Sequence, residues 1–104
     1  MNHQNIKPPY YAVIFSSKLT KNIDGYSEMA QKMEKLALEQ KGFLGIESAR
    51  NEIGITVSYW KDEQAIKRWK QQTDHMLAQK IGKEKWYESY RVHVAKVERD
   101  YFSE

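Results

Sequence analysis

The chain has no cysteine among its 104 residues, which excludes disulfide bonds and thiolate chemistry. It also lacks any apolar run long enough to cross a bilayer. The first residues, Met1 to Asn5, lack the charged and apolar regions of a signal peptide. From these three absences we expect a cytoplasmic protein.

Motifs that identify a chemistry are missing as well. There is no glycine-rich phosphate loop, no serine–histidine–aspartate set that the sequence can identify, and no cluster with metal-ligand spacing. The histidines His3, His75 and His93 are far apart in the chain. We therefore expect no metal site and no cofactor.

The composition is that of one folded domain. Hydrophobic residues make up 40% of the chain, which excludes a disordered protein, and the length fits a single core. The net charge of +3 comes mostly from lysines beside glutamates, as in Glu34-Lys35, which is typical of solvated helix faces. We expect no nucleic-acid or membrane partner. The predicted organisation is a flexible leader (1–9), one domain (10–99) and a C-terminal tail (100–104).

The segment from Thr56 to Trp69 organises the prediction. Its first half is rich in residues that favour strands, and Asp62 then offers a helix N-cap. Ala65, Ile66 and Trp69 follow at helical spacing, so they share one face. The segment therefore predicts a strand that leads directly into a helix carrying an indole inward.

The remaining elements follow from periodicity and from turn residues. The first predicted helix begins at a cap on Asp24 and ends at Gly42, where a residue in the left-handed conformation is expected. The second helical region is predicted to break, with one helix from Asp62 to about Gln72 and another from Thr73-Asp74 to Gly82. Four strands are predicted, at Tyr10–Phe15, Phe43–Arg50, Ile55–Trp60 and Trp86–Val97. The order β-α-β-β-α-β predicts an α+β, ferredoxin-like antiparallel sheet with the helices on one face.

The first strand is apolar at nearly every position, which is typical of a strand covered on both faces. The helices cover one face. A second copy of the chain is the economical cover for the other, with Val92 and Val94 of the last strand assigned to that contact. We therefore predict a homodimer, and we expect Ser16 to Asn22 to form a loop.

Six side chains are candidates for a small-molecule site. His75 opens the irregular second helical region, and either it is solvated or it contributes to a pocket. Trp69 is either core or a hydrogen-bond donor to a ligand. The other four either form aromatic walls of a cavity or fill the space between sheet and helices: Tyr59, Trp60, Trp86 and Tyr90.

Several segments resemble the antibiotic biosynthesis monooxygenase (ABM) domain family. They are Gly42-Phe43-Leu44-Gly45, Ser58 to Glu63, Ala65-Ile66, Trp69, His75 and Trp86-Tyr87. The resemblance spans roughly residues 10–99. It implies a ferredoxin-like fold that pairs as a dimeric α/β barrel. Relatives include cofactor-free oxygenases of aromatic polyketides and quinol-like compounds, and others degrade haem.

The haem-degrading relatives use an asparagine on the first strand, a tryptophan on the helix after the third strand, and an iron-binding histidine further along. Trp69 matches the tryptophan. No asparagine lies in Tyr10–Phe15, and Gln79 falls at the position of the iron ligand. The resemblance therefore argues against haem as the substrate.

For a cofactor-independent monooxygenase, the resemblance implies a substrate anion that reduces O2 directly in a dry pocket. His75 would be the base, with Trp69 and Tyr59 as wall and donor. Three alternatives stay open: a non-catalytic small-molecule-binding or stress-related dimer, a haem-binding or haem-degrading enzyme, and an RNA-binding domain. The last is disfavoured, because Gly54 to Tyr59 lacks the basic residue and aromatic spacing of an RNA-recognition strand.

Overall fold

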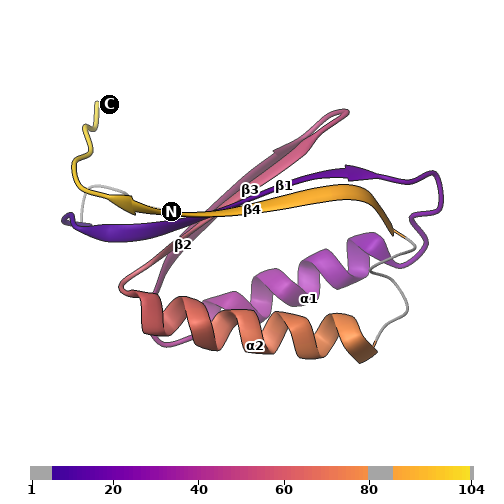
Figure 1. The fold of residues 1–104 in the computed structure, drawn as a ribbon, viewed down its shortest axis with the longest axis horizontal. Coiled ribbons are helices and arrows are strands. Elements are labelled where there is room, and N and C mark those ends of the chain that lie inside the picture. Colours follow the sequence, from indigo (N-terminus) through magenta and orange to yellow (C-terminus); the bar gives the residue numbers. More distant parts are fainter. Residues whose placement is uncertain (1–5, 80–85, 104) are drawn as a thin grey trace.

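The computed structural model describes residues 6–79 and 86–103. Their elements, in chain order, are β1 (Tyr10–Leu19), α1 (Tyr26–Leu38), β2 (Phe43–Arg50), β3 (Gly54–Trp60), α2 (Glu63–Gln79) and β4 (Tyr87–Val97). The strands form one antiparallel sheet in the order β2-β3-β1-β4, and both helices lie on one of its faces (Figure 1). The predicted ferredoxin-like fold is confirmed.

β1 is longer than the sequence predicted. The segment Ser16–Leu19, which we expected in a loop, continues the strand, and Ser17 pairs with Gly54 of β3 and with Tyr90 of β4. β1 lies between two partner strands, so its backbone finds hydrogen-bond partners on both sides. This pairing outweighs the weak strand preference of the serines.

α1 does not begin at a side-chain cap on Asp24. Gly25 occupies the N-cap position at φ 83° with no side-chain cap hydrogen bond. The helix ends at Leu38, and Gly42, at φ 87°, stands just before β2. A Cβ atom on Gly42 would lie 2.7 Å from the Cβ atom of Ala65, so the turn requires glycine. The left-handed conformation of Gly42 was predicted correctly, but this residue forms the turn that leads into β2, and the helix has already ended at Leu38.

α2 is one continuous helix, so the predicted break is wrong. Its N-cap is confirmed, since Asp62 Oδ1 accepts a hydrogen bond of 2.8 Å from the backbone N–H of Ala65. At the expected break, the Thr73 hydroxyl donates to the Lys70 carbonyl at 3.0 Å, and Lys70 forms an ion pair with Asp74 at 2.6 Å. Both contacts lie within the helix, so Thr73-Asp74 does not start a new one. The predicted end at Gly82 lies outside the described residues.

The strand register divides the side chains between the two faces of the sheet. Trp60 packs against Trp69 of α2, which identifies the helix face. Directly paired residues share a face, so three cross-strand pairs also lie there: Tyr11 with Trp60, Val13 with Val94, and Phe15 with Val92. The assignment of Val92 and Val94 to the opposite face is therefore wrong. Their exposed fractions, 50% and 52%, show that the helices leave much of β4 open.

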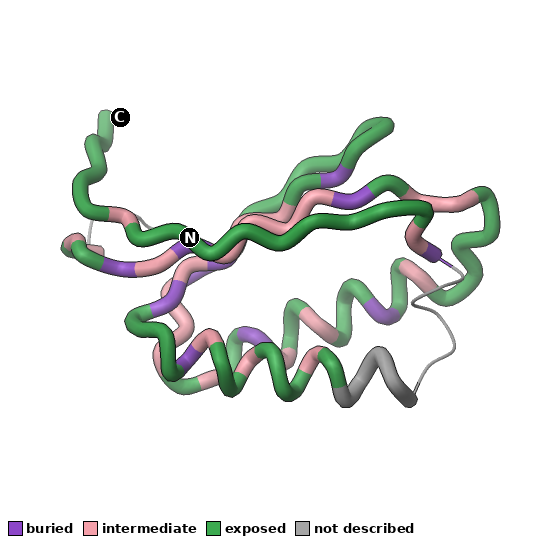
Figure 2. Tube along the Cα trace, viewed as in Figure 1, coloured by how far each residue is buried: buried purple, intermediate pink, exposed green. Residues whose placement is uncertain are grey.

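The face opposite the helices, called the far face below, carries the alternate set. It includes Tyr10, Ala12, Ile14, Val57, Tyr59, His93, Ala95 and Val97. Neither helix lies on it, and within the described chain only the tail after β4 turns over one end (Figures 1 and 2). The expectation that β1 is covered on both faces is therefore not met within one chain, since Ile14 is only half-buried.

Candidate functional site

Trp60 and Trp69 form the closed end of the contact between sheet and helices. Their ring centroids lie 5.5 Å apart, and Phe43 packs edge-on against Trp60. Trp60 is fully buried, and its indole N–H donates to the Ser58 hydroxyl at 2.8 Å. Because its donor is satisfied within β3 and no surface is left, Trp60 is a core residue and lines no cavity.

Trp86 holds the start of β4 against the start of α1. Its indole N–H donates to the Asp24 carbonyl at 2.8 Å, and its ring meets Tyr26 edge-on at 5.9 Å. Its own carbonyl accepts a bond of 2.7 Å from the N–H of Thr20, just after β1. Trp86 is 5% exposed, so its role is to fasten three segments that are distant in sequence.

Four aromatic residues, Phe15, Tyr26, Tyr87 and Tyr90, form a continuous group that we call the tyrosine cluster. Phe15 lies 5.4 Å from Tyr87 and 5.7 Å from Tyr90, while Tyr87 lies 5.8 Å from Tyr90 and 6.0 Å from Tyr26. These are ordinary distances for interacting rings. The cluster joins β1, β4 and α1, and Tyr90 is 46% exposed, so one side is open to solvent.

Arg50 adds a cation–ring contact to this cluster, with its guanidinium carbon 5.6 Å from the centre of the Tyr26 ring. The guanidinium donates to both the hydroxyl and the carbonyl of Ser17, and to the Tyr26 hydroxyl at 3.4 Å. Gly54, paired with Arg50 across the hairpin, makes this possible. A Cβ atom on Gly54 would lie 2.1 Å from the guanidinium, so glycine leaves the space that the arginine fills.

Tyr87, the central residue of the tyrosine cluster, is held in the protonated form. Burial raises the pKa of Tyr87, and the electrostatic interaction and hydrogen bond with the Tyr26 phenol act in the same direction, while the charge of Arg50 opposes them. Tyr87 is therefore a hydrogen-bond donor at neutral pH. Together the cluster and Arg50 offer ring faces, phenolic hydroxyls and one fixed cation, which suits a flat aromatic compound that carries negative charge.

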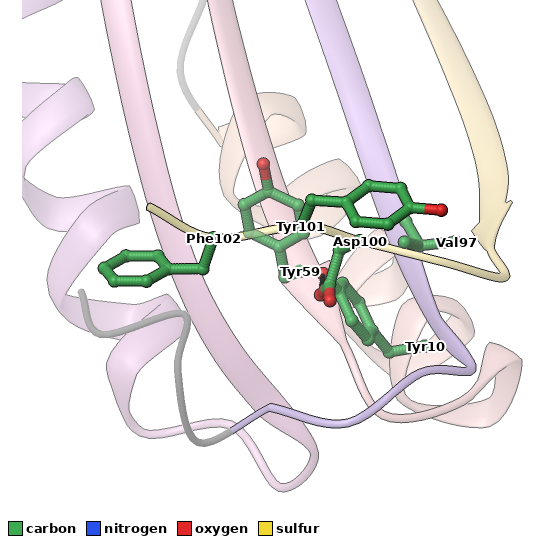
Figure 3. A pocket seen from close by; sticks show the side chains of 6 residues that line it. All are labelled: Tyr10, Tyr59, Val97, Asp100, Tyr101 and Phe102. Atoms are coloured by element: carbon green, nitrogen blue, oxygen red, sulfur yellow. Dashed lines mark hydrogen bonds between the residues drawn. The ribbon is translucent and has the colours of Figure 1, made fainter. Parts of the chain in front are cut away.

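A pocket lies on the far face, at the end where the tail crosses it. It has a volume of about 390 Å³ and is lined by Tyr10, Tyr59, Val97, Asp100, Tyr101 and Phe102 (Figure 3). Tyr10 donates to Asp100 Oδ2 at 2.5 Å, and Tyr59 donates to Glu47 Oε1 at 2.7 Å. Burial, followed by the hydrogen bond to the carboxylate, raises the pKa of each tyrosine to about 12.

The predicted site residues therefore separate into three places. Trp60 and Trp69 lie together at the closed end of the helix face, and Trp86 and Tyr90 lie at the other end of that face. Tyr59 is on the far face, because strand neighbours point to opposite sides. Hence the prediction that Trp69 and Tyr59 share one pocket as wall and donor is wrong.

His75 lies in the second half of α2, and its side chain is outside the described residues. Because α2 is continuous, six residues separate His75 from Trp69 by a rotation of about 240° around the helix axis. The two residues are thus not on one helix stripe. The irregular segment from which His75 was expected to reach a pocket is therefore absent, because α2 continues through it.

The sequence reasoning missed Arg50, Ser17, Tyr26 and Tyr87 as a group. Two signals could have found them. Arg50 and Gly54 flank the predicted hairpin turn, so they face each other across it. Phe15 and Tyr90 fall on alternating positions of two strands, but Tyr90 pairs with Ser17, in the part of β1 that was expected to be a loop.

Two findings bear on other kinds of site. Among the described residues, no three histidine, aspartate or glutamate side chains come close enough to hold a metal ion. No helix in the same part of the chain is long and apolar enough to cross a membrane.

Comparison with known proteins gives one relative in sequence and several in structure. The uncharacterized protein YqjZ of Bacillus subtilis is 54% identical over 95 residues, covering 89% of this chain and 83% of YqjZ. SnoaB, a cofactor-independent oxygenase from Streptomyces nogalater, superposes with a TM-score of 0.73 at 10% identity, over 89% of this chain and 97% of SnoaB. A Nitrosomonas europaea protein assigned to the antibiotic biosynthesis monooxygenases gives 0.71 at 11% identity, over 88% and 93%. No protein-family model matches the sequence.

Proposed function

The chain belongs to the family of YqjZ and has the fold of the ABM domains, and we propose that it is a cofactor-independent monooxygenase of a small electron-rich aromatic or quinol-like compound. The fold neighbour SnoaB is itself a cofactor-independent oxygenase. The observation that carries the proposal is the tyrosine cluster with Arg50, because it offers the groups that such a substrate needs.

The substrate would lie against the rings of Phe15 and Tyr90 at the open side of the cluster. The half-exposed Tyr90 leaves access from solvent, and aromatic rings stack well on a flat π system. The guanidinium of Arg50 would then hold the oxygen on which negative charge develops. The single O–H of Tyr87, which hydrogen-bonds with Tyr26 in the structure, would turn to donate a second hydrogen bond to that oxygen when the substrate binds.

The proposed reaction starts with loss of a proton from an acidic C–H or phenolic O–H of the substrate. The resulting anion transfers one electron to O2, and the substrate radical and superoxide combine to form a C–O bond. Protonation gives a hydroperoxide, which loses water to leave a carbonyl. Overall, a CH2 group and O2 become a C=O group and water, so the substrate supplies all the electrons.

His75 is proposed as the proton acceptor, and Trp69 as the wall that closes the helix face at the end opposite the tyrosine cluster. His75 is suited by type, since histidine is the side chain whose ordinary pKa lies closest to neutral. Trp69 is half-buried above Trp60, so part of its ring remains available. The roles of both residues rest on the sequence.

The test is oxygen uptake and product analysis with anthrone- and quinol-type compounds. We expect turnover by the wild type and a rate lower by roughly 100- to 10,000-fold for His75→Ala, the usual cost of removing a general base. Trp69→Phe should lower the rate less and keep the fold. Equal rates for wild type and His75→Ala would remove His75 from the mechanism. Absence of any turnover would favour the non-catalytic binding protein.

The proposed active form is a homodimer that contacts through the far face. Ile55 is 46% exposed there, the half-buried Ile14 and Val57 adjoin it, and neither helix covers them. An exposed apolar patch of this kind is typical of a protein–protein interface. Light scattering after size exclusion tests the proposal, and a monomer mass at micromolar concentration would contradict it.

A further inference from the structure

The pocket at the tail end of the far face has a composition that the monooxygenase reaction does not use. Four of its six lining residues are aromatic, and one, Asp100, is an acid. Tyr10 and Tyr59 meet edge to face, with centroids 5.9 Å apart and an interplanar angle of 73°. Figure 3 shows the tail passing over Tyr59 beside Tyr10, with the side chains of Tyr101 and Phe102 projecting from it in opposite directions.

Both inner tyrosines donate their hydroxyl hydrogens to carboxylates, Tyr10 to Asp100 and Tyr59 to Glu47. A phenol that donates to a carboxylate has more electron density on its ring, which strengthens the attraction of the ring face for a cation. Asp100, which lines the pocket, adds negative charge. The outer rings remain open, since Tyr101 is 88% exposed and Phe102 is 55% exposed.

From this arrangement we propose that the pocket is an aromatic cage that binds a small molecule carrying a quaternary ammonium group. A cation attracted by ring faces and by a nearby acid is the recognised use of such a cage. A primary ammonium needs several acceptors for its N–H groups, whereas the pocket offers mainly ring surface and one acid, Asp100, which suits a cation without N–H groups. The pocket volume of about 390 Å³ accommodates a choline-sized group.

This site is separate from the proposed active site, and it lies at the tail end of the far face, whereas the proposed dimer contact centres on Ile55, four residues from Tyr59 along β3. The cage lies on the far face and the tyrosine cluster on the helix face, on opposite sides of β1. Binding at the cage can therefore be measured without any oxidation substrate. Failure of one proposal leaves the other unaffected.

The experiment is a calorimetric titration of the full chain with choline and, as a matched control, with dimethylbutanol, its neutral isostere. We expect saturable choline binding with a Kd on the order of 1 mM, as suits a ligand of this size. The neutral isostere should bind at least about tenfold more weakly, because it loses the attraction to the rings and the acid.

Variants locate the binding. Tyr101→Ala should weaken choline binding by about 3- to 30-fold, and Tyr101→Phe, which keeps the ring, should preserve it. This side chain is almost fully exposed, so its removal leaves the fold intact. Equal binding of choline and dimethylbutanol, unchanged binding by Tyr101→Ala, or absence of saturable binding would each overturn the proposal. So would binding of phosphatidylcholine vesicles without binding of free choline, which would indicate a lipid surface.

Discussion

Tyr59 and Trp60 are neighbours in β3, yet they lie on opposite faces of the sheet and are held in different ways. Trp60 has no exposed surface, and its indole N–H donates a hydrogen bond to the hydroxyl of Ser58, two residues earlier in β3. Tyr59 packs against Tyr10 and extends its hydroxyl to Glu47, an exposed residue. The helix face therefore uses its aromatic groups for packing, whereas the far face keeps their polar ends at the surface.

The two ends of the helix face also differ in whether their aromatic groups are closed off by packing or open to solvent. At one end, Trp60 and Trp69 close the contact between β3 and α2. At the other end, the tyrosine cluster is open and carries phenolic hydroxyls and a guanidinium. An active site requires groups that can exchange bound water for substrate. The open end is therefore the better candidate active site, although the sequence analysis did not single out most of its residues.

The largest expected effect comes from substituting Trp60 and Tyr59 separately, which tests whether the two faces of the sheet contribute differently to stability. Trp60→Ala should lower the free energy of unfolding by about 3–5 kcal/mol, because it leaves a large cavity in a fully buried site. Tyr59→Phe keeps the ring and should cost no more than about 1.5 kcal/mol, the usual worth of one hydrogen bond. Urea unfolding measures both, and similar losses would show that the two faces are not distinct.

Arg50 tests whether the open end is functional. Arg50→Ala should lower oxygenation of an electron-rich aromatic by about 100- to 1,000-fold, the usual cost of removing one oxyanion donor. Arg50→Lys should recover little, because lysine lacks the planar fork that bridges Ser17 and Tyr26. The exposed Lys67 supplies the control, since Lys67→Ala removes the same charge elsewhere. Equal rates for both alanine variants would exclude Arg50 from the site.

Most of the fold follows from the sequence, because local patterns and tertiary contacts agree. The hairpin of β2 and β3, the Asp62 cap and the left-handed Gly42 were all predicted, and each depends on a few adjacent residues. The errors concern element boundaries that are set by contacts between residues distant in sequence. β1 continues through Ser16–Leu19 because β3 and β4 pair with it, and α1 starts without a cap from Asp24.

The candidate site was harder to predict, because it depends on the faces of the strands and on their register. An aromatic residue in a strand gives no sign in the sequence of which face it occupies, so Tyr59 was grouped with Trp69. Arg50 reaches Ser17 across Gly54, a contact between residues 33 apart. Only the assembled sheet brings these groups together. The ABM resemblance was confirmed at the level of the fold, and it does not specify these residues.

A smaller effect is expected when charge is placed on each face in turn. Ile55 on the far face and Val92 on the helix face are exposed to similar extents, 46% and 50%. Ile55→Lys should weaken the homodimer at least about tenfold by introducing a charge into its apolar contact. Val92→Lys should leave the dimer intact. Light scattering over a dilution series compares them, and a dimer that tolerates Ile55→Lys would place the contact elsewhere.

The far-face tyrosines predict a loss of stability in alkali. Their pKa values are about 12 in the folded chain and 10.0 for an ordinary tyrosine. Between about pH 10 and pH 12 the unfolded chain therefore releases protons that the folded chain retains, so the free energy of unfolding falls as pH rises. Below pH 10 both states are protonated and this contribution is fully present.

A Tyr10→Phe, Tyr59→Phe double variant should lose less stability over this range than wild type. Tyr87, with its raised pKa, remains in both proteins and leaves a common residual slope. Urea unfolding at stepped pH measures the difference, and identical slopes would show that the carboxylate contacts of Tyr10 and Tyr59 do not hold their protons.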